Sequence, residues 1–167
     1  MKNLSRSAPS SYELRKLRLI ADYQICKGAG KVLFPQEEIE ITHSKKTRRI
    51  RHIYLNNQLI ATLRPKDGVF ALTPFGGTLL LKGIPFINLP IIVAQNQIAT
   101  YIREGRSLFC KHVVSISSDI RACDEVLVTD ENYNLIAVGR ACLCADEIKN
   151  FSSGLAAKIR YGVPNSL

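Results

Sequence analysis

Patterns that mark membrane proteins and common enzymes are missing from this sequence of 167 residues. No stretch approaches the run of about 18 to 20 apolar residues that a membrane span requires. Residues 1–11, MKNLSRSAPSS, lack the apolar centre of a secretory signal. The sequence contains no G-x-x-x-x-G-K-[ST], G-x-S-x-G or H-E-x-x-H motif. We therefore expect a cytoplasmic protein that is not an enzyme and uses no cofactor.

Cysteine and histidine are too few and too scattered to predict a metal site. The five cysteines are an odd number, which does not suit a disulfide framework. We expect them to be reduced thiols in an apolar core. Cys142 and Cys144 resemble half of a zinc site, but no second Cys or His pair lies at usable spacing. The histidines form no ligand motif either; they are His43, His52 and His112.

Positive charge is abundant, and most of it lies in the first part of the chain. The net charge is +9. Residues 1–64 hold 13 Lys and Arg against 5 Asp and Glu, a net of +8, whereas residues 65–167 hold 10 against 9, a net of +1. Five of the cations lie in HSKKTRRIRHIYL at 43–55. This clustering favours binding of nucleic acid over the alternative, a solvated hairpin edge protected against aggregation.

The hydrophobic pattern of the first part predicts a small domain at 12–84, preceded by a flexible basic tail at 1–11. We expect a helix over 12–27 that Gly28 and Gly30 end. Three short antiparallel strands should follow within 38–65, with a first turn at 44–47 and a tight hairpin turn at Asn56-Asn57. A turn at 65–68, a strand over 69–73 and a helix over 75–82 complete the domain.

After the proline-flanked stretch GIPFINLPIIVA the pattern restarts, and we expect the two halves to pack on each other. A strand at IIV leads to a helix over 95–104, which Gly105 stops. Further strands are expected at 107–114, 125–129 and 135–143, then a short helix around 146–151 and a closing strand, AAKIRYG. Many short strands with two short helices are typical of a compact, partly closed barrel. The chain is thus predicted to be α+β.

The cationic hairpin has a spacing that suits phosphate contacts. Arg49 and Arg51 lie two residues apart, so in a strand they would face the same way while Ile50 and Tyr54 face the other. One face would bury apolar side chains and the other would present cations to phosphates. The candidate RNA contacts here are Lys45, Lys46, Arg48, Arg49 and Arg51.

Residues 90–163 contain a distinctive series of segments: the helix ending at Glu104-Gly105-Arg106, the strand carrying Lys111, and the stretches IRACDEVLV, AVGRA and GLAAKIRYG. In this order and spacing they resemble a PUA domain, the RNA-binding module of pseudouridine synthases and archaeosine transglycosylases. The first half resembles the domain that precedes PUA in archaeal tRNA-guanine transglycosylase, through ADYQICKGAGKVLFP, RRIRHIYLNNQLIATLRPKDGVFALT and GGTLLL. The resemblance implies a small α/β pre-PUA domain packed on a PUA pseudo-β-barrel with short helices.

The resemblance also implies RNA binding without base exchange, because the family's catalytic barrel, nucleophilic aspartates and zinc site have no counterpart here. In the family this region holds the acceptor stem and 3′ end of tRNA, and a separate catalytic transglycosylase chain is an expected partner. For Gly105, a plain helix C-cap is an equal alternative to close approach of a phosphate or base. The residues that match the family's RNA surface are Gly105, Arg106, Ser107, Lys111, Lys158 and Arg160.

Two other functions stay open at this point. One is a stand-alone RNA adaptor in ribosome assembly or translation. The other is an enzyme whose unrecognised site uses Cys142, Cys144 or His52, although no nucleophile–base pair can be assembled from the sequence.

Overall fold

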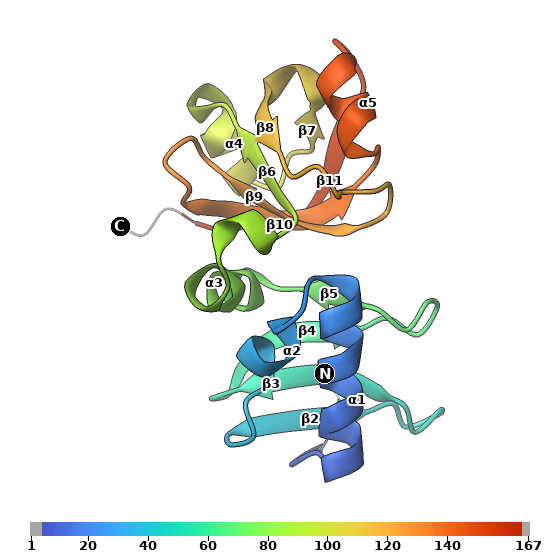
Figure 1. Ribbon diagram of the computed structural model, residues 1–167. Helices are drawn as coiled ribbons and strands as arrows, with labels where there is room; N and C mark the ends of the chain where they lie inside the picture. Colours follow the sequence, from blue (N-terminus) through green and yellow to red (C-terminus); the bar gives the residue numbers. More distant parts are fainter. Residues whose placement is uncertain (1–4, 165–167) are drawn as a thin grey trace. The chain divides into compact units, whose positions relative to one another are not determined.

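The computed structural model describes residues 5–164, and the chain divides into two units between Ile84 and Pro85. Each unit combines one β-sheet with short helices, so the predicted α+β class is confirmed (Figure 1). Among the described residues, no helix is both long and apolar enough to cross a membrane.

The first unit is built on an antiparallel meander, in which strands adjacent in sequence are adjacent in the sheet. The β3–β4 turn has φ angles of 48° at Asn56 and 68° at Asn57, as predicted for a tight hairpin. The strands are β1 (Arg6–Ser7), β2 (Ile39–His43), β3 (Ile50–Leu55), β4 (Gln58–Leu63) and β5 (Phe70–Leu72).

Three helices accompany this sheet, and Figure 1 shows α1 and α2 on the same face of it. Helix α1 begins in a capping box, in which Ser10 and Glu13 bond to each other's backbone N–H groups, and it buries Leu14, Leu17 and Ala21. The helices are α1 (Ser11–Gln24), α2 (Ala29–Leu33) and α3 (Pro74–Gly83).

The prediction that Gly28 and Gly30 end the first helix is wrong. Helix α1 already ends at Gln24, and the two glycines begin α2. Gly28 caps α2 with a φ of 97°, a conformation that favours glycine. Gly30 lies inside α2, where a Cβ would come within 2.3 Å of the Arg18 carbonyl oxygen. Gly28 therefore allows the sharp turn between the two helices, and Gly30 allows α2 to pack directly against the backbone of α1.

Part of the predicted tail belongs to these elements, since residues 6–7 form β1 and residue 11 begins α1. Arg6 pairs with Thr42 and Ser7 with Ile41, which makes β1 one of the two edge strands of the sheet. Ser10 caps α1. Residues 1–4 of that predicted tail lie outside the described residues.

The second unit is a curled, nearly closed sheet with strand order β7-β11-β10-β9-β6-β8 (Figure 1). Only the β6–β9 pair among these neighbours is parallel in residues 85–164. The strands are β6 (Ile91–Ala94), β7 (Leu108–Phe109), β8 (Val113–Ile116), β9 (Glu125–Thr129), β10 (Leu135–Ala141) and β11 (Leu155–Gly162). The helices are α4 (Ala99–Arg103) and α5 (Ala145–Asn150), with 3₁₀ turns η1 (Phe86–Asn88), η2 (Asn96–Ile98) and η3 (Cys110–His112).

The single strand predicted over 107–114 is instead two strands at opposite ends of the sheet. β7 pairs with β11, whereas β8 pairs with β6. The turn η3 between them redirects the chain, and it carries Lys111, which was expected on a strand. The helix predicted over 95–104 is likewise a 3₁₀ turn followed by the short α4. An apolar cluster that includes Ile102, Val126 and Ile136 fills the curled sheet.

Candidate nucleic-acid interface

The β2–β3 loop of the first unit carries most of the predicted cations. Two backbone hydrogen bonds close it: Ser44 N–H donates to the Arg49 carbonyl at 2.9 Å, and Arg48 N–H donates to the Ser44 carbonyl at 2.9 Å. The side chains of Lys45, Lys46, Arg48 and Arg49 are exposed. The fold therefore holds a compact, strongly basic loop at one end of the sheet.

Strand β3 begins with a bulge that simple alternation does not predict. Thr42 pairs with His52, but the next residue, His43, pairs with Ile50. Arg51 is therefore an extra residue without a partner position on β2. Compared with regular alternation from Ile50 onward, this extra residue reverses the side of the sheet to which the later side chains of β3 point.

The prediction that Ile50 and Tyr54 share a face is wrong for this reason. Ile50, Ile53 and Leu55 are buried, whereas the half-buried Tyr54 stacks under Arg6, whose Cζ lies 3.9 Å from the ring centre. Arg49, expected on the strand beside Arg51, lies in the loop before it.

A groove of about 620 Å³ runs between the start of α1, the β2–β3 loop and the β4–β5 turn. The residues that α1 and the β4–β5 turn contribute to this groove could not be predicted from the sequence, because only the fold brings these segments to the loop. Arg64 is partly neutralised by Asp67 at 2.9 Å. The cations that line the groove are Lys16, Arg48, Arg49, Arg51 and Arg64.

One carboxylate of this groove, Glu13, is bound from two sides. Its Oε1 lies 2.7 Å from His43 Nε2, and its Oε2 accepts bonds from the Ser10 N–H at 2.9 Å and the Ser10 hydroxyl at 2.8 Å. Partial burial would raise the pKa of Glu13, but the bonds from Ser10 and His43 outweigh it and hold the pKa below its ordinary 4.5. The ionised carboxylate therefore ties the loop-bearing strand β2 to the start of α1.

We expect this bond network to fail in acid. Because the pKa of Glu13 is lower in the folded state, its contribution is complete above pH 4.5 and is lost as the pH falls through the folded-state value. Glu13→Gln should lower the free energy of unfolding of the first unit by about 1 kcal/mol at neutral pH. The difference from wild type should shrink below pH 4.5, and urea titrations at pH 7 and pH 3.5 test this. A difference that stays constant between these pH values would contradict the assignment.

In the second unit, Gly105 ends α4 in a Schellman motif. Arg106 N–H donates to the Tyr101 carbonyl at 3.0 Å, and Gly105 N–H donates to that of Ile102 at 2.9 Å. Gly105 has a φ of +89°, and among the described residues no heavy atom would lie within 4 Å of a Cβ placed on it. The C-cap reading is confirmed. The open space means that a ligand backbone can also come close, which stays a prediction.

Arg106, Ser107 and Lys158 come together beside this glycine. Leu108 of β7 pairs with Ala157 of β11, so Ser107 lies next to Lys158 at the sheet edge. The Arg106 guanidinium lies 5.3 Å from the Tyr101 ring centre, and its side chain is 70% exposed. Lys158 is also exposed. This edge therefore offers two accessible cations, a hydroxyl and an aromatic ring.

Lys111 and Arg160 have different surroundings. Lys111 is exposed in η3. Arg160 is half-buried and forms a bidentate ion pair with Glu125, which is only 3% exposed; one of the two bonds, from Nη2 to Oε2, measures 3.0 Å. The charge of Arg160 is thus used within the unit, and we leave it out of the proposed contacts.

Arg140 is a further exposed cation of the second unit, and it was not among the predicted RNA contacts. It lies on β10 directly opposite Lys158, and both side chains are exposed. Its register partner on the other side, on β9, is Glu125, whose carboxylate Arg160 also binds. The pairing of β10 with β11 reveals this site, and spacing along the chain could not.

The cysteines, histidines and carboxylates of residues 5–164 form no metal centre. No group of three or more His, Cys, Asp or Glu there could hold a metal ion. The cysteines are free; Cys110 is buried as expected of a core thiol, but Cys123 is exposed, and the other three are half-buried. Burial raises the pKa of the Cys110 and Cys26 thiols, which disfavours the reactive thiolate.

Two sequence families match the chain. The patch-forming domain C2 of tRNA-guanine transglycosylase matches residues 15–86, and the PUA domain matches residues 90–163. This chain is a C2 domain followed by a PUA domain. The basic loop and groove therefore lie in the C2 domain. The sheet edge beside Gly105, with Arg106, Ser107 and Lys158, lies in the PUA domain, and we call it the PUA edge.

Curated relatives share this arrangement in their carboxy-terminal part. The tRNA-guanine(15) transglycosylase of Methanothermobacter thermautotrophicus is 37% identical over 150 residues, which are 90% of this chain and 23% of the relative. That of Thermoplasma volcanium is 43% identical over 153 residues, 91% of this chain and 24% of the relative. The chain thus spans about a quarter of the length of these relatives.

Solved structures share the fold. A hypothetical protein from Pyrococcus horikoshii OT3 superposes with a TM-score of 0.74 at 15% identity, covering 95% of this chain and 94% of that one. A conserved PUA domain protein from Thermoplasma acidophilum gives a TM-score of 0.69 at 21% identity, covering 97% and 95%. These likenesses support the C2–PUA fold alone.

Proposed function

We propose that this protein binds the acceptor stem and 3′ end of tRNA as the non-catalytic, RNA-holding part of a transglycosylase. The observation that carries the proposal is the match of about 90% of the chain to proteins named tRNA-guanine(15) transglycosylase, at 37% to 43% identity. The exposed cations of both domains fit an RNA partner, because phosphates provide most of the affinity of nucleic-acid complexes.

The two domains would divide the work. The groove beside the β2–β3 loop is lined by cations and by the ring of Tyr12, which suits phosphate contacts that do not depend on sequence. The PUA edge combines Arg106, Lys158 and the exposed Tyr101 around an accessible glycine, which suits an unpaired 3′ end. The C2 domain would supply affinity and the PUA domain placement.

Base exchange would be carried out elsewhere. What supports this is that the chain matches the C2 and PUA domains, which form the carboxy-terminal part of the relatives. We propose a separate catalytic transglycosylase chain as the partner, acting on the tRNA that this protein holds.

A stand-alone RNA adaptor in ribosome assembly or translation is the second candidate. The Pyrococcus horikoshii and Thermoplasma acidophilum structures, of which this chain covers 94% and 95%, show that the fold also occurs in chains of about this length. Co-sedimentation with pre-ribosomal particles, and not with tRNA, would reverse the order of the two candidates.

The test compares the affinity of a folded tRNA with that of an unrelated RNA duplex of equal length, by fluorescence anisotropy across a salt series. We expect about a tenfold preference for tRNA and affinity that falls steeply with salt. Arg106→Gln with Lys111→Gln should reduce the preference, whereas Lys149→Gln, an exposed lysine on α5, serves as the control. Equal affinity for the two RNAs would overturn the proposal.

A further inference from the structure

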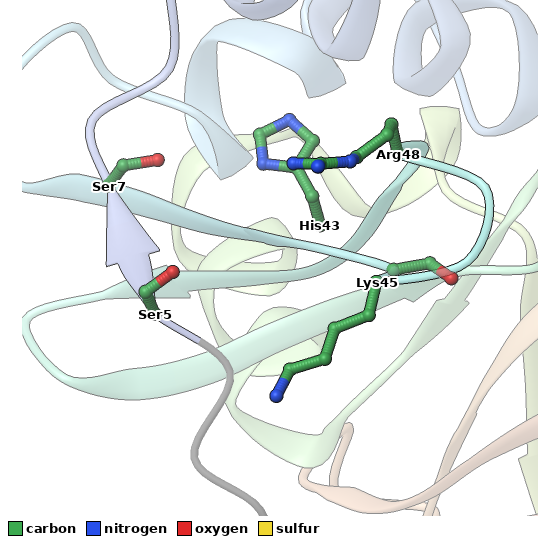
Figure 2. A pocket seen from close by; sticks show the side chains of 6 residues that line it. Ser5, Ser7, His43, Lys45 and Arg48 are labelled. Carbon is green, nitrogen blue, oxygen red and sulfur yellow. The ribbon is translucent and has the colours of Figure 1, made fainter.

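A separate pocket of about 390 Å³ lies on the C2 domain, between β1 and the β2–β3 loop. Figure 2 shows the hydroxyls of Ser5 and Ser7 directed from β1 toward the side on which His43 and Arg48 lie. Its lining residues are Ser5, Ser7, His43, Ser44, Lys45 and Arg48.

The strand register explains why hydroxyls, and not the intervening arginine, line this pocket. Ser5 and Ser7 lie two residues apart, so they face the same side of the sheet. Arg6 points to the other side, where its Cζ lies 3.9 Å from the Tyr54 ring centre and its Nη1 lies 3.5 Å from Glu40. The pairing of β1 with β2 thus separates hydroxyl donors from a cation that already has partners.

The charge in the pocket comes from the loop. Lys45 and Arg48 are exposed, and within residues 5–164 neither takes part in an ion pair. The carboxylate of Glu13 contacts the lining through His43, whose Nε2 lies 2.7 Å from Glu13 Oε1. The His43 Nε2 is therefore bound to Glu13, and the other atoms of the imidazole ring are the ones available to line the pocket.

Arg48 takes this place at a conformational cost. Its φ is +56°, a left-handed conformation that is unfavourable for a residue other than glycine. The loop hydrogen bonds from Arg48 N–H to Ser44 and from Ser44 N–H to Arg49 hold it there. The same turn makes Arg48 part of both this pocket and the neighbouring basic groove.

We propose that this pocket binds one phosphate group. The ammonium, the guanidinium and the hydroxyls that line this cavity are of the kinds that bind phosphate oxygens in protein–nucleic acid complexes. The volume lies at the small end of ligand sites, enough for a phosphate and part of a nucleotide. This inference rests on the proposed function, in which RNA is the partner. It adds that the β2–β3 loop forms one defined phosphate site, in addition to the general attraction of its cations for RNA. The phosphate is either the 5′-terminal monoester of the RNA or a diester of its backbone.

The test uses inorganic phosphate and a short single-stranded RNA with either a 5′-phosphate or a 5′-hydroxyl. Ser7→Ala removes a pocket hydroxyl and no charge. Lys45→Gln removes a pocket cation, and Lys46→Gln is its matched control, the same change at the next residue outside the pocket lining. Ser7→Ala and Lys45→Gln should each weaken binding about tenfold, and Lys46→Gln by less than about threefold.

The two RNAs identify the source of the phosphate. If Ser7→Ala weakens only the 5′-phosphorylated RNA, the pocket takes the terminal monoester; if it weakens both equally, the pocket takes a backbone diester. Unchanged binding of all three probes in Ser7→Ala, with equal losses in Lys45→Gln and Lys46→Gln, would overturn the pocket and leave only diffuse charge. Thermal unfolding of each variant verifies the fold. Because inorganic phosphate needs no tRNA, failure of the pocket is distinguishable from failure of acceptor-end recognition.

Discussion

Replacing Arg160 by methionine is expected to lower the free energy of unfolding of the PUA domain by about 3 kcal/mol. Glu125 is 3% exposed, and Arg160 binds both of its carboxylate oxygens. Removal of the guanidinium leaves a buried carboxylate without this bidentate partner, and such losses exceed those of surface pairs several-fold. Urea denaturation, with hydrogen exchange of the β9, β10 and β11 amides to identify the domain, measures the loss.

A matched control and a double variant sharpen this test. Arg121→Met removes an exposed arginine from the segment before β9 and should change stability by less than about 0.5 kcal/mol. Glu125→Leu combined with Arg160→Met should restore most of the stability, because an apolar pair of similar size often replaces a buried ion pair without loss. Equal effects of Arg160→Met and Arg121→Met would show that Arg160 is an ordinary surface cation, available to RNA as the sequence suggested.

The second large effect is expected at Gly30 of the C2 domain. Helix propensity alone favours alanine over glycine by about 1 kcal/mol. Packing acts in the other direction, because a Cβ at Gly30 would lie 2.3 Å from the carbonyl oxygen and 2.6 Å from the Cα of Arg18. Neither atom is the end of a flexible side chain, so α2 must shift away from α1. We expect Gly30→Ala to destabilise the domain by about 2 to 3 kcal/mol.

Lys31→Ala in the same helix serves as the control, since Lys31 is exposed and the change should be close to neutral. The two variants are compared by urea denaturation, with hydrogen exchange of the α1 amides as the local readout. Unchanged or raised stability in Gly30→Ala would mean that propensity dominates and that the α1–α2 contact is loose.

Much of the fold could be predicted from the sequence because its signals are local. Asn56-Asn57 predicts the β3–β4 hairpin, and the apolar runs predict β9 and β10 to within two residues. The prediction failed where a distant partner decides the local structure. The bulge at Arg51 depends on how β3 pairs with β2, and the break at Cys110–His112 depends on β7 and β8 joining opposite ends of one sheet.

The candidate site shows the same division. Residue type and spacing correctly identified an exposed basic loop, and Gly105 as a helix cap. They could not reveal that Arg160 is bound to Glu125, 35 residues away. Nor could they place Lys16 and Arg64 in the loop's groove, or Arg140 opposite Lys158. Each of these relations joins segments that meet only after folding.

The most direct test of acceptor-end recognition compares binding of an intact tRNA with that of the same tRNA lacking its 3′ CCA, across a salt series. If the PUA edge holds the 3′ end and the C2 domain holds phosphates, trimming should weaken binding about tenfold while both RNAs keep a steep salt dependence. Equal affinity of the intact and trimmed tRNA would contradict this account, since the basic C2 surface would then explain binding alone.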